Sequence, residues 1–190
     1  VVRELAPGLP VMAMVKADAY GHGAERLLPV LARHADALAV ARLGEAQALR
    51  DAGYRGQLLL LCGVSDAAEL SHALALQLDI LVHDATQLAL FARHPQATAT
   101  GTTFWLKLDS GMHRLGFAPE AYAQAFASLK SLPWCKAIVG MTHFASADEP
   151  DNHKTADQIA CYAACTAGLA LDNHSLANSA GLIGWPAARR

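Results

Sequence analysis

The chain has 190 residues, of which 53% are hydrophobic and 17% are charged, a composition that allows one sizeable core and indicates a single globular unit. Its 15 basic and 17 acidic side chains give a formal net charge of -2. No basic stripe with interleaved aromatic residues occurs, which argues against a nucleic-acid partner. The longest apolar run, residues 58–62, is far below the roughly 20 residues that a membrane helix requires. We therefore expect a soluble protein with no membrane partner.

The two ends of the chain and its cysteines indicate where the protein resides. The start shows no charged lead before a long apolar stretch and no small-residue cleavage site, so we expect no export signal and a cytoplasmic location. The missing initiator methionine and the abrupt end at Arg190 predict truncation at both ends. The absence of a CxxC pair favours small buried thiols in a reducing compartment over metal or disulfide chemistry. The cysteines are Cys62, Cys135, Cys161 and Cys165.

Short apolar runs separated by helical stretches predict seven strands. The runs cover residues 10–15, 37–41, 58–62, 79–82, 103–108, 137–142 and 175–179. Between them, the stretches 44–52 and 122–132 place Ala, Leu and Phe side chains on one side, as expected of a helix that covers a sheet. The stretch 24–35 has a similar pattern that Pro29 interrupts.

Capping and breaking residues mark the predicted helix boundaries. An aspartate three positions before a glutamate or glutamine indicates a capping box, a proline suits a first helical position before residues 120–130, and glycine or proline marks a stop. The residues concerned are Asp66 with Glu69, Asp84 with Gln87, Pro119, Gly53 and Pro95. The regular alternation implies βαβ units with right-handed crossovers and outer helices.

The first turn of the chain favours a barrel over an open doubly wound sheet. No GxGxxG follows the first strand, and the glycines there, Gly21 and Gly23, flank a histidine. A (β/α)8 TIM-type barrel needs roughly 250 residues, so seven βα units leave the eighth strand beyond Arg190. With no linker or repeat visible, we predict one incomplete α/β barrel domain over residues 1–190.

Lys16 is the first candidate for chemistry. The two-residue period of a strand places Met12, Met14 and Lys16 on one face, and the lysine follows the strand at the end where barrel enzymes keep their active sites. Burial there would lower its pKa and suit it to form a Schiff base. A loop lysine in water is the alternative. Tyr20 and the glycines after it offer a phenol and backbone amides to a phosphate.

Two later strand ends carry further candidates. Alternation turns Lys107 inward with Trp105, where it is either functional or paired with a carboxylate such as Asp109. Taken alone, Arg114 is more typical of a surface and His143 of a core. None of the nine histidines has a metal-binding spacing, so we predict no metal.

The stretch from Val15 to Gly23, VKADAYGHG, resembles the attachment signature for pyridoxal 5'-phosphate (PLP) in bacterial alanine racemases of fold type III. The resemblance implies that Lys16 carries the cofactor as an internal aldimine and that Tyr20 contacts its phosphate. Asp18 stands where many members have asparagine, which we interpret as tolerated variation.

Three further segments resemble the same family, in its order and spacing. Residues 109–117 imply that Arg114 reaches the cofactor ring oxygen and the substrate carboxylate, and that Lys107 is a carbamylated lysine that steadies it; His113 replaces the usual glycine. The segment around His143, with an acidic loop after it, implies a cofactor contact. The last segment implies that Ser179 binds the phosphate and that Asn178 supports it.

The resemblance also implies a reaction and its partners. The expected activity is the PLP-dependent interconversion of L-alanine and D-alanine, a cell-wall precursor, by a homodimer. The family's first segment, eighth barrel strand and C-terminal β domain are missing here, including the tyrosine that serves as second base, so we expect poor activity from this chain alone. The alternatives are a single-domain PLP-homeostasis protein of the same barrel type, a catalytically dead barrel module, and a cofactor-free lysine aldolase.

Overall fold

A computed structural model describes residues 1–94 and 101–189, in which seven parallel strands form one sheet in the order β1 to β7. The strands are β1 (Met12–Met14), β2 (Ala37–Val40), β3 (Gln57–Leu60), β4 (Asp79–Val82), β5 (Thr102–Lys107), β6 (Cys135–Met141) and β7 (Asn173–Ser175). The helices are α1 (Val2–Leu5), α2 (Lys16–Tyr20), α3 (Ala24–His34), α4 (Leu43–Asp51), α5 (Ala67–Ala75), α6 (Ala85–Arg93), α7 (Pro119–Lys130), α8 (Lys154–Thr166) and α9 (Ser179–Gly184), followed by a short 3-10 turn.

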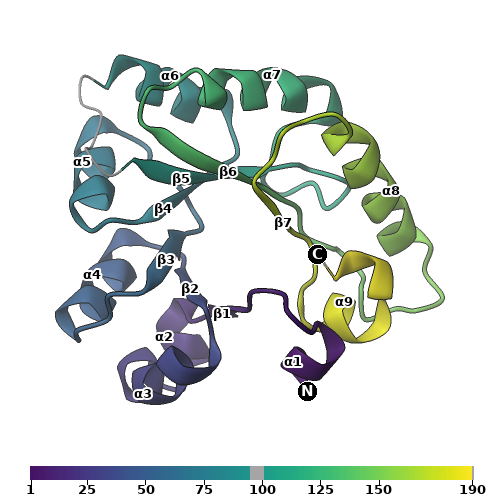
Figure 1. Cartoon of the computed structure of the whole chain (residues 1–190), viewed down its shortest axis with the longest axis horizontal. Helices are drawn as coiled ribbons and strands as arrows, with labels where there is room; N and C mark the ends of the chain where they lie inside the picture. Colours follow the sequence, from purple (N-terminus) through teal and green to yellow (C-terminus); the bar gives the residue numbers. More distant parts are fainter. Residues whose placement is uncertain (95–100, 190) are drawn as a thin grey trace.

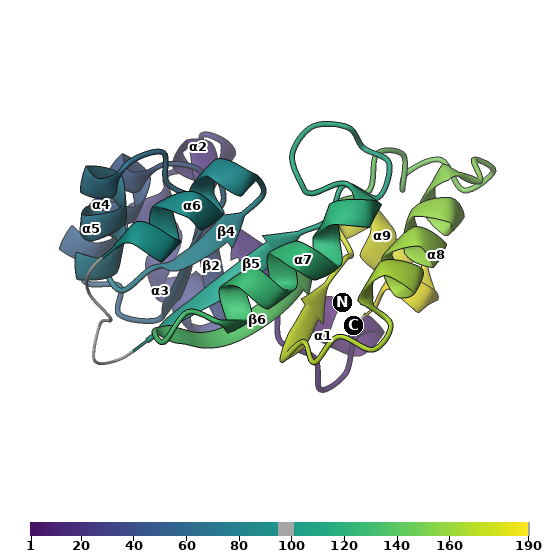
Figure 2. The ribbon, with the colours of Figure 1, turned by 90° about the horizontal axis from the view of Figure 1, so that it is seen from above.

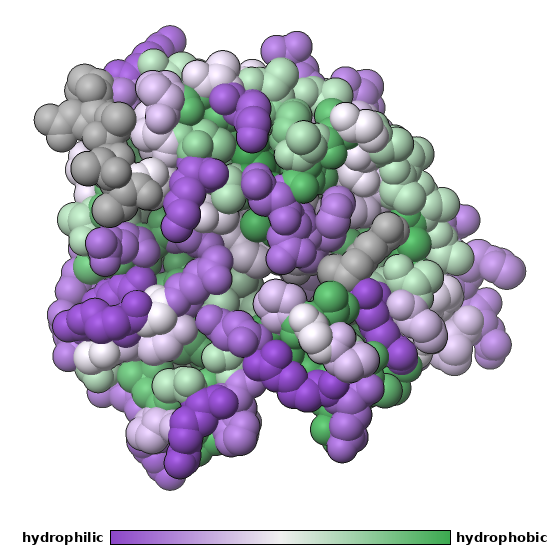
Figure 3. All heavy atoms as spheres, in the orientation of Figure 1, coloured by the Kyte–Doolittle hydropathy of each residue, from purple (hydrophilic) through white to green (hydrophobic). Residues whose placement is uncertain are grey.

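The sheet curls into a half-barrel with helices around its outer side (Figure 1). The two ends of the sheet, β1 and β7, do not pair with each other, and both chain ends lie near this open side in two perpendicular views (Figures 1 and 2). The surface is notched between the lobe of α2 and α3 and the N-terminal segment (Figure 3). The predicted incomplete barrel of seven βα units is confirmed.

Apolar side chains pack on both faces of the sheet, as the two-residue alternation predicts. The outer face joins the helices in the main core, which includes Val15, Phe104 and Leu106. The inner face holds a smaller cluster of Ala39, Leu59, Leu81, Trp105, Val139 and Met141, with Met12 and Leu61 against it. This arrangement confirms that the face of β1 carrying Met12, and the face of β5 carrying Trp105, point into the barrel.

The helices α5 and α6 begin at the predicted capping aspartates, but the second hydrogen bond of each capping box has a different partner than predicted. Asp66 accepts a hydrogen bond from the backbone N–H of Glu69 at 2.8 Å, but the Glu69 carboxylate accepts from Ser65 and not from Asp66. At α6, Asp84 accepts from the N–H of Thr86 while the Gln87 side chain accepts from the N–H before Asp84. Both aspartates are therefore N-caps, and the return bond reaches one residue further back.

Other boundaries are confirmed or corrected by the structure. Pro119 opens α7 as predicted. Pro29 lies inside α3 without ending it; the carbonyl that loses its donor is that of Glu25, an exposed residue in the first turn. The predicted stop at Pro95 lies outside the described residues. The expectation of buried cysteines is wrong, since Cys62 is exposed and the other three are half-buried; all four are free.

The seventh strand is the clearest correction. It spans Asn173–Ser175 rather than residues 175–179, and Ser179 is the first residue of α9. The side chain of Asn178 accepts a hydrogen bond from the N–H of Gly181 at 2.8 Å and so caps this helix. The first strand is also shorter than predicted, Met12–Met14 instead of residues 10–15. Within the described residues, no helix is long and apolar enough to cross a membrane.

Candidate active site at the carboxyl ends of the strands

Lys16 lies at the carboxyl end of β1 and begins a left-handed turn. The four residues after it, from Ala17 to Tyr20, have φ between +53° and +56°, and each costs roughly 1–2 kcal/mol in this conformation. The sequence predicts a polar loop here, and the structure shows a strained turn. Strain of this kind persists only where surrounding bonds hold it.

Two carboxylates hold the turn. Asp18 accepts from the N–H of Ala24 at 2.7 Å, a bond that an asparagine carbonyl also makes, so the aspartate is compatible with this place in the motif. Glu45, on α4, accepts from the N–H of Ala17 at 2.6 Å. Its other oxygen accepts from two backbone N–H groups at the start of α4, at 2.8 and 3.0 Å. Sequence reasoning missed Glu45, whose one visible signal is an acidic side chain in the first turn of a helix.

Lys107 ends β5 on the inner face and is 5% exposed. Burial and, to a smaller extent, the positive charge of Arg114 lower its pKa to about 8, against the opposing effect of Asp109. At neutral pH roughly a tenth of a lysine with this pKa is the neutral amine. The inward lysine predicted from the alternation is confirmed, and its carboxylate neighbour offsets only part of the cost of burial.

Arg114 stands on a loop that returns to the strand it left. The N–H of Asp109 donates to the carbonyl of Phe117, and the N–H of Phe117 donates to the carbonyl of Lys107, both at 2.9 Å. Gly116 permits this closure, because a Cβ there would lie 2.5 Å from the N atom of Asp109 and its φ is +129°. In Figure 2 the loop lies on the same side of the molecule as α2 and the segment that leads into α8.

His113 adopts a left-handed conformation, with φ +58°, that explains why glycine suits this position. Its N–H donates to Asp109 at 2.9 Å, and its Nδ1 lies 3.2 Å from the other carboxylate oxygen of the same residue. A glycine would keep the backbone bond, so the histidine side chain adds one contact inside the loop, that of Nδ1. Hydrogen bonds from the loop hold the pKa of Asp109 below its usual range in spite of partial burial.

His143 lies within electrostatic reach of three other predicted residues, Lys107, Arg114 and Lys16. It follows β6 by two residues, on the parity of the inward side chains Val139 and Met141. Burial, the largest cause, and the positive charges of Lys107, Arg114 and Lys16 together lower its pKa to about 4. The ring is therefore neutral at neutral pH, and three cationic side chains from β1 and β5 lie within electrostatic reach of it.

The remaining predicted residues follow β1 and β7, and two of them are exposed, as Arg114 is. Tyr20 ends the left-handed turn with 62% of its surface exposed. Asn178 uses its side-chain oxygen as the cap of α9, and the exposed Ser179 is the first residue of that helix. The structure thus places Lys16, Lys107 and Arg114 within electrostatic reach of His143, and it leaves Tyr20 and Ser179 exposed on the segments that follow β1 and β7.

The curled parallel sheet and the lysines at its carboxyl edge define a barrel-type enzyme domain. A family model described as the N-terminal domain of alanine racemase matches residues 1–190. The chain belongs to this family.

Individual relatives agree with the family match. An alanine racemase of Nitrosococcus oceani is 46% identical over 188 residues, and the catabolic alanine racemase of Pseudomonas aeruginosa is 44% identical over 181 residues. These alignments cover 98% and 95% of the present chain and 51% and 50% of those proteins. The crystal structure of the biosynthetic alanine racemase from Pseudomonas aeruginosa matches with a TM-score of 0.92 and 39% identity, over 98% of this chain and 51% of that one. The chain spans about half the length of the curated relatives it matches.

Proposed function

We propose that the protein is a PLP-dependent alanine racemase and that Lys16 holds the cofactor. The observation that carries the proposal is that the carboxyl ends of β1, β5 and β6 and the loop closed on β5 place Lys16, Lys107 and Arg114 within electrostatic reach of one neutral histidine. Such a site repels a further cation and favours a ligand that carries several negative charges. PLP, with a phosphate and a ring oxygen, is a ligand of that kind.

The residues present fit this cofactor. The amine of Lys16 would hold its aldehyde carbon, and Arg114 would pair with its ring oxygen and with the carboxylate of alanine. Ser179 would give its hydroxyl to the phosphate, with Tyr20 as a second hydroxyl and Asn178 as the cap that sets the direction of α9. His143, uncharged at neutral pH, would contact the cofactor without adding a fourth positive charge.

Lys107 supports Arg114 in this arrangement. Burial is the larger cause of the lowered pKa of Lys107, and the positive charge of the exposed Arg114 lowers it in the same direction. A neutral amine reacts with carbon dioxide to give a carbamate and release one proton, which replaces a positive charge by a negative one. We propose this modification for Lys107, because it converts the repulsion of Arg114 into an ion pair.

Racemisation requires a proton to leave one face of a carbon and another to arrive at the opposite face. When bound, PLP withdraws electrons from the substrate and acidifies its Cα proton. Lys16 would take or give that proton on one face, and a second base must act on the other. We therefore expect the 190-residue chain alone to interconvert the alanine enantiomers slowly or not at all, and propose that the whole protein is a cytoplasmic homodimer.

Binding of PLP to the chain tests the proposal. Wild-type chain titrated with PLP should develop a visible absorbance band that borohydride removes. The Lys16→Ala variant should show no such band, while Lys130→Ala, which removes an exposed lysine at the end of α7, should titrate like wild type. A band that persists in Lys16→Ala, or a wild type that develops none, would overturn the assignment of Lys16.

A further inference from the structure

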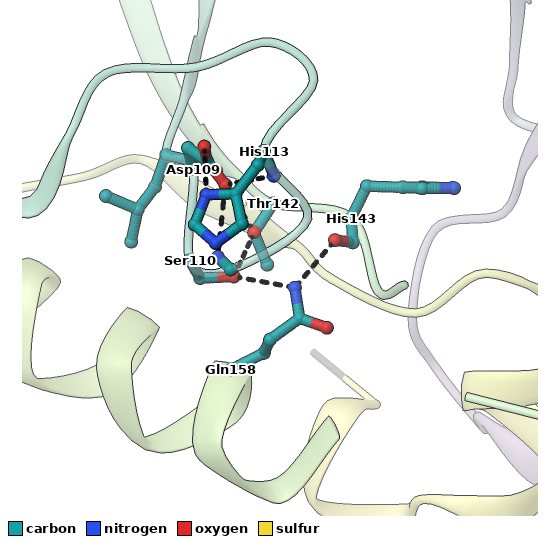
Figure 4. A network of polar contacts seen from close by, with 8 residues as sticks. Asp109, Ser110, His113, Thr142, His143 and Gln158 are labelled. Atoms are coloured by element: carbon teal, nitrogen blue, oxygen red, sulfur yellow. Dashed lines mark hydrogen bonds and ion pairs between the residues drawn. The ribbon is translucent and has the colours of Figure 1, made fainter. Parts of the chain in front are cut away.

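Gln158, on the outer helix α8, has a buried side chain whose hydrogen-bonding groups are all used. It is 1% exposed. Its Nε2 donates to the hydroxyl of Ser110 at 3.2 Å and to the carbonyl of His143 at 3.0 Å. Its Oε1 accepts from the N–H of Ala145 at 3.0 Å. Figure 4 shows the two bonds that Nε2 donates, one to the loop after β5 and one to the segment after β6.

The amide of Gln158 also fixes the direction of a chain of hydroxyl groups. Because Ser110 accepts from Nε2, its own proton is available to Thr142, whose hydroxyl oxygen lies 2.7 Å away. The proton of Thr142 then goes to the carbonyl of Leu108 at 3.1 Å. Each proton that Gln158, Ser110 and Thr142 donate in this series thus has one acceptor. The last acceptor is the carbonyl of Leu108, the residue after Lys107.

These bonds connect the two segments that carry Arg114 and His143. Ser110 begins the loop of Arg114, and Gly111 after it lies so close that a Cβ there would meet the Gln158 side chain at 3.4 Å. On the other segment, Gln158 holds the carbonyl of His143 and the N–H two residues later. The ring of His143 points away from Gln158 (Figure 4). Gln158 therefore binds the backbone of this segment and makes no contact with the ring that would occupy its nitrogens.

We propose that Gln158 is a positioning residue that fixes Arg114 and His143 relative to each other and thereby sets the affinity of the site for PLP. The identity of the ligand rests on the proposed function, whereas the coupling of the two segments rests on the hydrogen bonds alone. Only a primary amide supplies two donors and one acceptor here. A glutamate at this position loses both donors and places its charge against the carbonyl of His143.

The fold contains a matched control in Gln87, on α6. This glutamine is 4% exposed. It connects the loops after β3 and β4 by hydrogen bonds, as Gln158 connects the loops after β5 and β6. Its side chain accepts from the N–H of His83 at 2.8 Å and donates to the carbonyl of Val64 at 3.4 Å. Neither loop carries a predicted site residue, so Gln87→Met should have a comparable cost in stability without the effect on the site.

The first measurement uses NMR of the chain without ligand. Gln158→Met should shift the ring resonances of His143 and the backbone amide of Arg114 well beyond the changes that Gln87→Met causes at the same two groups. Ser110→Ala should shift the Arg114 amide and leave the His143 ring unchanged, because Gln158 keeps its bonds to the second segment. Equal, small shifts at both groups in the two methionine variants would overturn the proposal.

The second measurement is PLP affinity by absorbance titration. We expect Gln158→Met to raise the Kd for PLP on the order of tenfold, the lower end of what losing the support of a ligand-binding residue costs, and Gln87→Met to change it less than twofold. If Gln158→Met does not fold, Gln158→Glu and Ser110→Ala give the same comparison, and an unchanged Kd in both would overturn the proposal. If wild type does not bind PLP, the proposed function fails and the NMR comparison alone decides the role of Gln158.

Discussion

Replacing Lys107 by methionine should stabilise the protein while damaging its site. Lys107 is almost fully buried on the inner face of β5. Burial and the charge of Arg114 lower its pKa from 10.5 to about 8. In the unfolded chain the same amine has its ordinary pKa, so the unfolded state binds the proton more tightly than the folded state does.

The size of the effect follows from this difference. A shift from 10.5 to about 8 corresponds to roughly 3 kcal/mol of destabilisation when the lysine is charged in both states. That penalty is fully present below pH 8 and disappears as pH rises toward 10.5, where the folded state has released its proton. Methionine has a similar shape and no charge, so Lys107→Met should be about 2–3 kcal/mol more stable than wild type at pH 7.

Urea unfolding between pH 6.5 and 10.5 measures this directly. The buffers are kept free of carbon dioxide and bicarbonate, so that the amine stays unmodified. The free energy of unfolding of wild type should rise toward that of Lys107→Met over this range, and the two should converge at the upper end. Parallel curves, or a variant less stable than wild type at pH 7, would refute the reasoning that the buried charge is a cost.

Three further results are expected. Because the pKa of His143 is lowered to about 4 in the folded state, the unfolded state binds more protons than the folded state between pH 4 and 6.5. The free energy of unfolding of wild type should therefore fall as pH falls through that window. His143→Gln should show a smaller fall in urea unfolding. Gly140→Ala should cost about 1–3 kcal/mol in the same assay, because its methyl group would overlap the hydroxyl of Tyr162; a neutral substitution would contradict this packing. The Glu45 carboxylate accepts hydrogen bonds from several backbone N–H groups, including that of Ala17, and Glu45→Gln would place an amide donor among them. We expect this substitution to raise the Kd for PLP on the order of tenfold. An unchanged affinity would show that the turn holds without the carboxylate.

The barrel and the inward Lys107 could be predicted because they depend on local periodicity. Alternation along β5 places Lys107 and Trp105 on one face whatever the neighbouring strands are, and the same rule puts Met12 on the inner face of β1. The capping aspartates of α5 and α6 act over three residues or fewer, so their signal is also contained in the local sequence.

The features that could not be predicted depend on contacts between distant segments or on a competition between structures. Glu45 accepts a hydrogen bond from Ala17, 28 positions before it, and Gln158 donates one to Ser110, 48 positions before it. Neither residue has a local pattern that distinguishes it from other polar residues on helices. The predicted strand over residues 175–179 is wrong beyond its first residue, because Ser175 ends β7 and the cap at Asn178 begins α9 at Ser179. The left-handed turn after Lys16 is set by the bonds around it rather than by residue preference.

The four site residues that converge do so because parallel strands end at the same edge. Lys16, Lys107 and His143 each come from the end of a different strand, and Arg114 comes from a loop that the strand end closes on itself. Like charges gathered in this way cost stability in the absence of a ligand, which is the pattern of a site built to bind an anion.

Mass-spectrometric mapping of the reduced PLP adduct tests the central assignment most directly. The chain is incubated with a stoichiometric amount of PLP, reduced with borohydride and digested, and each lysine peptide is examined for the added pyridoxyl group. We predict that the label is found on Lys16. A label on Lys107, or one spread over the exposed lysines with Lys16 unmodified, would contradict the account.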